Sequence, residues 1–239
     1  MRKNNIIDIC DMTIKSIAKA ELGMSKLDDE ILNFEKTWAA PKVRHFLNNL
    51  CSYENVVYLE CGIARGSSLL SALYDNDIEA YACDLWLESK LGKEAYEKFV
   101  SNYNNFKDKI TPEKVRIING DCWDLTKNDV DIKPNIFYYD AGHSVDDHRK
   151  AFTHFLPLLD DVFILIVDDV CDGRVREGTQ MGISEFVSKN LGSIIWGITL
   201  PAFPSNSPYW EEGDKKPERF SDLDRWGNGF SIYIISQNR

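Results

Sequence analysis

The chain has 239 residues, of which 44% are hydrophobic and 28% are charged, and its formal net charge is −10. This length is sufficient for one substantial hydrophobic core with helical additions, and the composition is typical of a globular protein. A protein that binds nucleic acid through phosphates presents a basic face, and the sequence contains no cluster of lysine and arginine that would supply one. The acidic balance therefore argues against a DNA or RNA substrate.

Nothing in the sequence predicts secretion or a membrane span. Asp8 and Asp11 interrupt the amino-terminal segment where a signal peptide would be apolar, and the longest wholly apolar run, 162–167, is too short to cross a bilayer. The six cysteines contain no C-x-x-C pair, which argues against a zinc site or a disulfide scaffold. We therefore expect free thiols, no membrane contact and a cytoplasmic location.

Hydrophobic periodicity predicts three amino-terminal helices followed by alternating strands and helices. Helices are expected over 4–22, 27–36, 41–50, 67–74, 87–103, 145–156 and 179–190, and strands over 56–60, 79–84, 115–119, 136–140, 162–168, 194–198 and 230–235. This order predicts an α/β fold with a doubly wound, seven-stranded, mostly parallel Rossmann-like sheet. We divide the chain into an N-terminal helical extension, 1–52, and a main domain, 53–239. We expect the extension either to cover the cofactor side or to form the surface of a homo-oligomer.

The segment 56–68, VVYLECGIARGSS, has the pattern of a buried strand, a tight turn and a helix start. The strand carries a carboxylate at Glu60, and Gly62 and Gly66 follow it. A dinucleotide site has the spacing G-x-G-x-x-G and directs backbone N–H groups at a pyrophosphate. Here the glycine spacing differs and a carboxylate would repel phosphate. A cationic ligand such as S-adenosylmethionine (SAM) suits this turn better, and a nicotinamide-dependent oxidoreductase is disfavoured.

This segment resembles the first motif of class I SAM-dependent methyltransferases, with Ala64 in place of the frequent middle glycine. The resemblance implies that the cofactor-binding residues include Glu60, Gly62, Ala64, Gly66, Ser67 and Ser68. An ordinary strand–turn–helix corner of an α/β protein is the alternative interpretation.

Two further strand ends carry candidate cofactor ligands. Asp84, with the adjacent Leu85, closes the second strand 18 residues after Gly66, where an acid is placed to accept hydrogen bonds from ribose hydroxyls; alternatively, Asp84 only caps the next helix. The third strand is followed by Asp121-Cys122-Trp123. The resemblance implies that Asp121 accepts from the adenine amino group and that Cys122 and Trp123 flank the ring, although Gly-Asp is also a common turn.

The fourth and fifth strands both end in acids. Asp140 closes the fourth strand, and Asp168 and Asp169 close the fifth. Neighbouring parallel strands end at the same edge of a sheet, so we expect these three carboxylates to converge. Carboxylates crowded together repel one another unless a cation lies among them, which predicts a divalent metal site, for Mg²⁺ first and otherwise Mn²⁺ or Ca²⁺. The alternative is that the acid pair merely begins a solvated loop.

Asp140, His143 and the Asp168-Asp169 pair resemble the methyltransferase-24 type of class I enzymes, which includes metal-dependent O-methyltransferases of macrolide sugars. The acid triad is also similar to that of catechol and caffeoyl-coenzyme A O-methyltransferases, in which the fifth strand more often ends in Asp-Asn. The resemblance covers about residues 55–190, and Ala141, Gly142 and Val145 depart from it.

The resemblance implies a SAM-dependent O-methyltransferase in which a divalent ion activates a hydroxyl of a sugar or glycan. Asp140, Asp168 and Asp169 would hold the metal, His143 would act as the base, and Asp140 would also contact the cofactor. Catechol-like or other small hydroxyl acceptors are the alternative, as is a non-catalytic SAM-binding partner protein.

The stretch 199–228 holds four of the eight prolines and several aromatic residues. We interpret it as an insertion between the last two strands that forms a substrate lid. The alternative is that its rings pack the loop onto the body of the protein.

Overall fold

The computed structural model describes residues 6–34, 39–86, 90–200 and 226–238. Most of the predicted lid, 201–225, lies outside the described residues.

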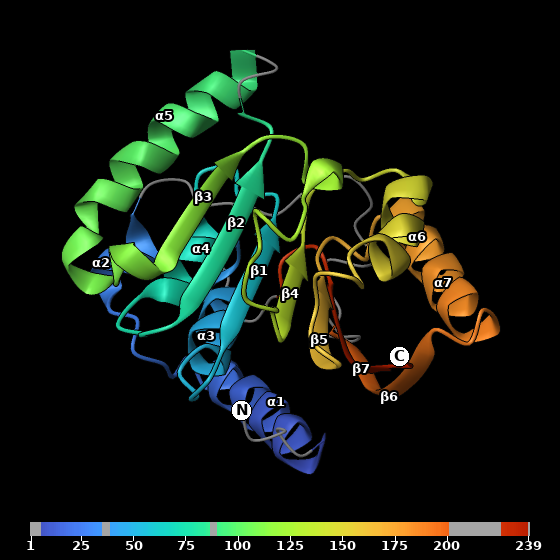
Figure 1. Ribbon diagram of the computed structural model, residues 1–239. Coiled ribbons are helices and arrows are strands. Elements are labelled where there is room, and N and C mark those ends of the chain that lie inside the picture. Colours follow the sequence, from blue (N-terminus) through green and yellow to red (C-terminus); the bar gives the residue numbers. More distant parts are fainter. Residues whose placement is uncertain (1–5, 35–38, 87–89, 201–225, 239) are drawn as a thin grey trace, which may run out of the picture.

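The chain folds into one seven-stranded sheet in the order β3-β2-β1-β4-β5-β7-β6 (Figure 1). The helices are α1 (Ile6–Glu21), α2 (Asp29–Asn33), α3 (Pro41–Leu50), α4 (Ser67–Leu73), α5 (Lys90–Asn105), α6 (Val145–His154) and α7 (Gly173–Ser188), with short 3-10 turns η2 (Lys107–Lys109), η3 (Pro112–Lys114) and η4 (Cys122–Asp124). The strands are β1 (Val57–Cys61), β2 (Glu79–Asp84), β3 (Val115–Asn119), β4 (Ile136–Tyr139), β5 (Val162–Val167), β6 (Gly192–Leu200) and β7 (Phe230–Gln237). Strand β7 runs antiparallel to both of its neighbours, β5 and β6, and the other pairs of described strands are parallel. The predicted fold class is confirmed.

The central strands β1, β4 and β5 are largely buried because helices cover each side of the sheet, whereas the edge strands β3 and β6 are partly exposed. Successive strand residues point to opposite faces: Tyr138 packs with the helices α1, α3, α4 and α5, whereas Phe137 and Tyr139 pack with α6 and α7. Phe46 of α3 lies in the first of these clusters. The amino-terminal helices therefore contribute to the main core; their predicted role in self-association stays a prediction.

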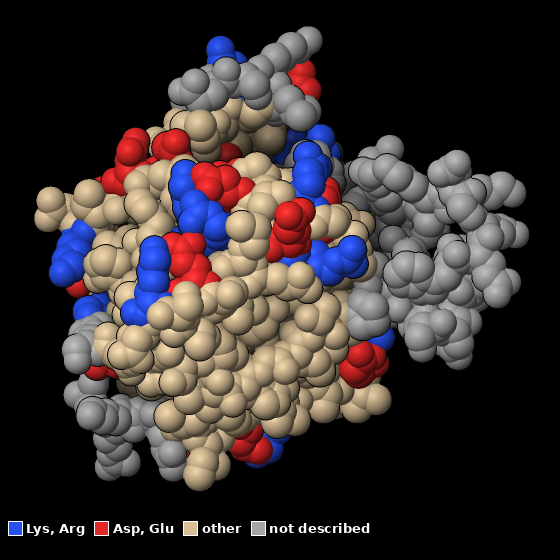
Figure 2. All heavy atoms as spheres, turned by 90° about the vertical axis from the view of Figure 1, so that its right-hand side faces the viewer, with Lys and Arg blue, Asp and Glu red and all other residues tan. Residues whose placement is uncertain are grey.

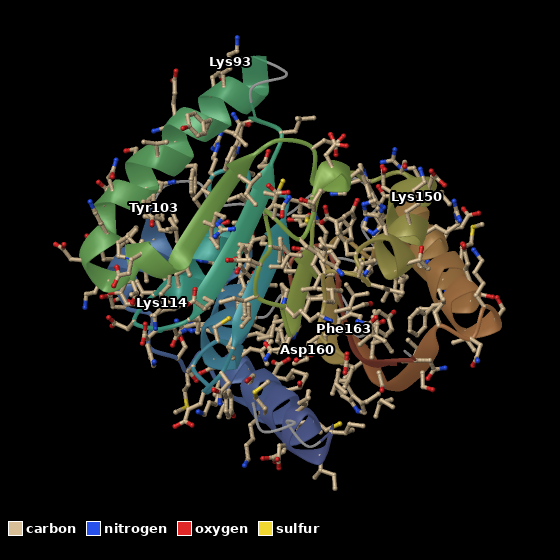
Figure 3. The ribbon with its side chains drawn as sticks, in the orientation of Figure 1. Lys93, Tyr103, Lys114, Lys150, Asp160 and Phe163 are labelled. Atoms are coloured by element: carbon tan, nitrogen blue, oxygen red, sulfur yellow. The ribbon has the colours of Figure 1, made fainter. Side chains whose placement is uncertain are left out.

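The parallel strands end together at one edge of the sheet. Cys61 pairs with Tyr139, and Tyr139 pairs with Val167, so the last residues of β1, β4 and β5 lie in register. Lys114 and Asp160, labelled in Figure 3, lie at the opposite edge, before β3 and β5 begin. The residues that follow the strands are therefore brought together on one side of the molecule.

The predicted start of α7 at residue 179 is wrong, because the helix begins at Gly173. Asp172 caps it, its side chain accepting a hydrogen bond from the backbone N–H of Arg174. Gly178 and Gly182 lie inside the helix because α6 is very close there: a Cβ at Gly178 would lie 2.4 Å from a backbone oxygen of α6. The predicted helix 27–36 is also too long at its start, since α2 begins at Asp29.

No helix in the described part of the chain combines the length and the apolar character needed to cross a bilayer. All six cysteines are free, as the sequence predicts.

Candidate active site

A cavity of about 600 Å³ lies at the carboxyl ends of the strands, a size within the usual range of small-molecule sites. The residues of the sequence prediction that line it are Gly62, Ala64, Asp84, Leu85, Asp121, Cys122, Trp123, Asp140, His143, Asp168 and Asp169. Five of these carry a carboxylate, and no lysine or arginine is among the described lining residues. The lining of the cavity is therefore acidic.

The turn after β1 is held by Asp84 from the end of β2. One carboxylate oxygen of Asp84 accepts hydrogen bonds from the backbone N–H groups of Ile63 (2.7 Å) and Ala64 (2.8 Å). Burial raises the pKa of Asp84, and these two hydrogen bonds oppose the rise. Gly62 has a φ of +93°, a conformation that glycine adopts without steric cost. This turn and β2 thus form one wall of the cavity.

Glu60 does not line the cavity but lies behind the wall that the turn after β1 and strand β2 form. Its side chain is fully buried on the same face of β1 as Tyr58, whose hydroxyl donates to one carboxylate oxygen, while the Ser68 hydroxyl donates to the other. Burial raises the pKa of Glu60 to about 8. Gly66, Ser67 and Ser68 are likewise absent from the lining residues. The cofactor contacts predicted for these four residues stay predictions, whereas the structure shows Glu60 fixing the first turn of α4.

We expect Glu60→Gln to be more stable than the wild type at pH 8. The folded pKa of Glu60 lies above its unfolded value, so its contribution to stability is complete below about pH 4.5 and is lost as the pH rises toward 8. The amide mimics the neutral acid and removes this loss, which is worth roughly 2 to 4 kcal/mol. Urea unfolding of both proteins at pH 5, 6.5 and 8 measures it. The prediction is contradicted if the difference in unfolding free energy between the two proteins is the same at all three pH values.

An aromatic wall closes one end of the cavity, after β3. Asp121 accepts a hydrogen bond from the backbone N–H of Trp123 (3.0 Å) and so caps η4. The indole of Trp123 stacks on Phe155 with ring centroids 5.3 Å apart and meets His154 edge-on at 5.1 Å. Packing on two sides fixes the orientation of Trp123, which suits a wall for a planar ligand ring.

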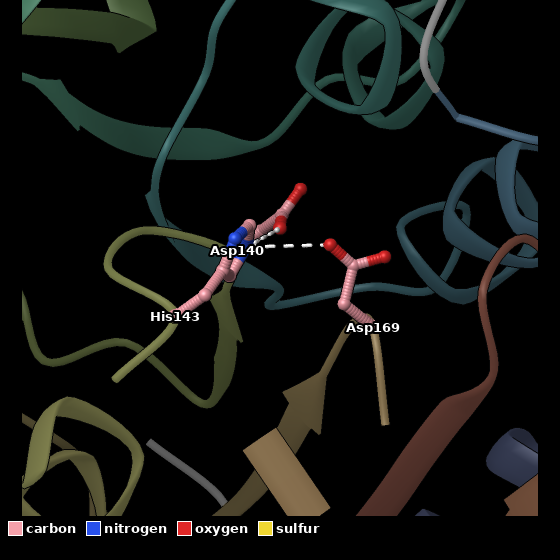
Figure 4. A group of neighbouring side chains, drawn as sticks. All are labelled: Asp140, His143 and Asp169. Carbon is pink, nitrogen blue, oxygen red and sulfur yellow. Dashed lines mark ion pairs between the residues drawn. The ribbon is translucent and has the colours of Figure 1, made fainter. Parts of the chain in front are cut away.

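Asp140, His143 and Asp169 meet at the other end of the cavity (Figure 4). The His143 Nε2 atom lies 3.5 Å from a carboxylate oxygen of Asp140 and 3.3 Å from one of Asp169. Asp169 has a φ of +58°, which turns it out of line with the strand that precedes it. The Asn228 side chain donates a hydrogen bond to the second carboxylate oxygen of Asp169 (2.8 Å).

Asp168 lines the cavity but does not belong to this group. The side chain is nearly buried, and its two carboxylate oxygens accept hydrogen bonds from the Tyr138 hydroxyl (2.5 Å) and the Asp169 backbone N–H (2.7 Å). Burial raises the pKa values of Asp140 and Asp168 well above their usual value, and repulsion from neighbouring carboxylates adds to both rises. Of the three predicted metal ligands, Asp140 and Asp169 thus lie together with His143, whereas Asp168 lines the cavity outside this group.

This donor set fits a divalent cation. The ligand atoms of Asp140, His143 and Asp169 all lie within 4.8 Å of one another, and the two separations from Nε2 are below the roughly 4.2 Å that two atoms bound to one ion at about 2.1 Å can reach. Carboxylates suit Mg²⁺, Mn²⁺ and Ca²⁺, and an imidazole in reach favours Mn²⁺ among these. A cation would also relieve the repulsion that raises the carboxyl pKa values.

No protein-family model and no curated protein matches the sequence. Many solved structures share the fold. Among them are an O-methyltransferase from Bacillus cereus in complex with S-adenosylhomocysteine (SAH) (11% identity, 95% of this chain and 100% of that chain covered, TM-score 0.60) and an SAH-bound methyltransferase from Podospora anserina (12%, 96% and 88%, 0.55). A cofactor-bound protein from MTB, Rv0187, is also similar (12%, 98% and 94%, 0.57). The fold is that of the class I methyltransferases. At these identities the likeness establishes the fold, while the reaction has to be argued from the site.

Six lining residues were not predicted individually as site residues, namely Cys83, Gly120, Ala141, Gly142, Gly227 and Asn228; the last two fall at the end of the predicted lid, 199–228. The first four flank residues that were predicted, so the strand ends already pointed to them. Gly227 and Asn228 come from the segment before β7, which lies next to the cavity only because β7 pairs with β5. No local pattern in the sequence connects them to the strand-end acids.

Proposed function

We propose that this protein transfers the methyl group of SAM to a hydroxyl of a sugar or glycan, assisted by a divalent cation. One observation carries the proposal: a cavity at the strand ends holds five carboxylates, and its described lining contains no lysine or arginine. SAM carries a sulfonium and an ammonium group and no phosphate, so such a cavity favours it. The phosphates of a nicotinamide dinucleotide or of a nucleic acid would be repelled.

In this proposal the cofactor extends between the two ends of the cavity. Trp123 and Asp121 would hold the adenine and Asp84 the ribose, and the turn at Gly62 would lie against the amino-acid part. The SAH in the solved methyltransferases of the same fold supports this choice of cofactor. Ligands of open α/β sheets bind beyond the carboxyl ends of the strands, which is where this cavity lies.

The chemistry needs a hydroxyl that is made nucleophilic next to the methyl donor. The oxygen attacks the methyl carbon, the bond from that carbon to sulfur breaks, and neutral SAH leaves. A divalent ion lowers the pKa of a hydroxyl that it binds; Asp140 and Asp169 would hold it, with Asp168 behind them. In this proposal His143 is not itself a ligand of the ion: its Nε2 atom lies 3.5 Å and 3.3 Å from the two carboxylates, and it would accept the proton of the hydroxyl.

The charges on the face that carries α6 and α7 do not favour a nucleic acid as the acceptor. On the face in Figure 2, basic and acidic side chains are interspersed and do not gather into a basic patch. On α6 and α7 they form ion pairs, as Arg149 does with Asp146 and Glu185 and as Lys189 does with Glu185. The choice of a sugar rests on the likeness of Asp140, His143 and the acid pair to the methyltransferase-24 pattern. Six free cysteines support the cytoplasmic location that we propose.

A panel of acceptors tests the proposal. The protein is incubated with SAM, Mn²⁺ or Mg²⁺ and either saccharides or catechols, and SAH release is measured. We expect release with saccharides, a loss of at least about 100-fold on chelation, and recovery when the cation is restored. Methylation of catechols alone would overturn the acceptor class, and a rate unchanged by chelation would overturn the role of the metal. SAH binding measured by calorimetry without transfer to any acceptor would favour a non-catalytic binding protein.

A further inference from the structure

Residues 226–229, which we call the strap, lead into β7 and lie across the loop after β5. The backbone N–H of Val170 donates to the carbonyl of Gly229 (3.2 Å), and that of Cys171 donates to the carbonyl of Asn228 (2.9 Å). Gly229 has a φ of +89°, and a Cβ there would lie 2.7 Å from the sulfur of Cys171. The strap can lie this close to the loop only because it has no side chain at that point.

The middle of the strap holds the carboxylate of Asp169. The Asn228 amide donates to the Oδ1 atom of Asp169 (2.8 Å), while the Oδ2 atom of Asp169 faces His143 Nε2 at 3.3 Å. Asp169 has a φ of +58°, which few non-glycine residues adopt. The backbone contacts to the strap keep the loop in this conformation, and the amide fixes the orientation of the carboxylate group. Because the amide is neutral, it orients the carboxylate without competing for a cation.

The first residue of the strap is anchored in the amino-terminal helices. The indole N–H of Trp226 donates to a carboxylate oxygen of Glu21 at the end of α1 (2.7 Å), and the other oxygen of Glu21 pairs with Lys42 of α3. Trp226 is only 3% exposed and packs against Phe46 and Phe230. A continuous path of contacts thus runs from α1 and α3 through the strap to Asp169.

We propose that the strap is a positioning element of the cation site. Asn228 orients the Asp169 carboxylate toward the position that the cation would take, and the contact between Trp226 and Glu21 fixes the strap to the N-terminal helices. This inference rests on the proposed function, since it assumes that Asp140 and Asp169 hold a divalent ion. It gives the N-terminal helices a part in the site although none of their residues lines the cavity. Replacing a group that orients a metal ligand typically lowers metal affinity by roughly 10- to 100-fold.

Replacing Asn228 by leucine tests the inference, because leucine has a similar shape and no donor. Binding of Mn²⁺ to the SAH complex and binding of SAH alone are measured by calorimetry. We expect Asn228→Leu to weaken Mn²⁺ binding about 10- to 100-fold and to leave the SAH affinity unchanged within about twofold. The matched control is Asn128→Leu, an exposed asparagine beside Arg116 at the other edge of the sheet, which should change neither affinity.

A second variant tests the anchor. Trp226→Phe keeps an aromatic ring among Phe46 and Phe230 and removes only the N–H donor to Glu21. We expect Mn²⁺ binding to weaken by a smaller factor, about 3- to 10-fold, again with unchanged SAH affinity. The proposal for the strap is overturned if both variants bind Mn²⁺ like the wild type, or if Mn²⁺ and SAH affinities fall together, which would indicate a general structural role. A wild type that binds SAH but no Mn²⁺ would instead overturn the metal site itself, and one that binds no SAH would overturn the proposed function.

Discussion

Asp140→Ala is expected to lower the rate of methyl transfer by at least about 10³-fold and at the same time to make the protein more stable. Asp140 lines the cavity between the turn at Gly62 and His143. Removing its carboxylate would take one ligand from the proposed cation site and one partner from His143. The stability should rise because burial and the charge of Asp169 hold the pKa of Asp140 well above its usual value, so ionisation of this carboxyl group opposes folding.

The two effects are measured separately, as SAH release at saturating SAM and as urea unfolding at pH 7. Asp146→Ala is the control, because Asp146 is an exposed acid that forms ion pairs with Arg149 and Lys150 at the start of α6. Its rate should stay within about twofold of the wild type, and its stability should fall slightly, as expected for surface ion pairs. Transfer by Asp140→Ala within tenfold of the wild type would show that the acid cluster is not the reaction centre.

The strands were predictable because buried parallel strands appear as short apolar runs between polar turns. The observed bounds of β2 and β3 equal the predicted ones, and β4 and β5 end one residue earlier. The start of α7 was not predictable in this way. Gly173, Gly178 and Gly182 lower the helix propensity of that stretch, and the reason for two of them is the close approach of α6. Tertiary packing there overrides the local preference.

The site was predictable to the extent that it follows from strand ends. Asp84, Asp140 and Asp168 lie in the cavity because parallel strands end at one edge. The face of the sheet on which a side chain lies follows from the alternation along each strand. Glu60 lies two residues after Tyr58, shares its face, and therefore points toward α4. The positive φ of Asp169 breaks this alternation, and Asn228, 59 residues farther along the chain, reaches Asp169 only through the pairing of β7.

Gly62→Ala is expected to destabilise the protein by more than about 3 kcal/mol, the largest loss for any change of one methyl group in the turn after β1. A Cβ at this position would lie 2.0 Å from the carbonyl oxygen of Asp140, and Gly62 has a φ of +93°. The backbone on both sides is fixed, because Gly62 donates its N–H to Cys83 and Asp140 donates its N–H to Cys61. Neither chain segment can move away without breaking contacts between neighbouring strands.

Gly120→Ala is the matched control for this change. Gly120 follows β3 at the same edge of the sheet and lines the same cavity, but a Cβ there would have no atom within 4 Å. Its stability in urea should fall by less than about 1 kcal/mol. Equal losses for the two variants would mean that the turn after β1 and the backbone of Asp140 are not in contact in solution. If the difference is found, the turn after β1 and the backbone of Asp140 are in contact in solution, and a substitution that displaces the Asp140 backbone would also displace this turn.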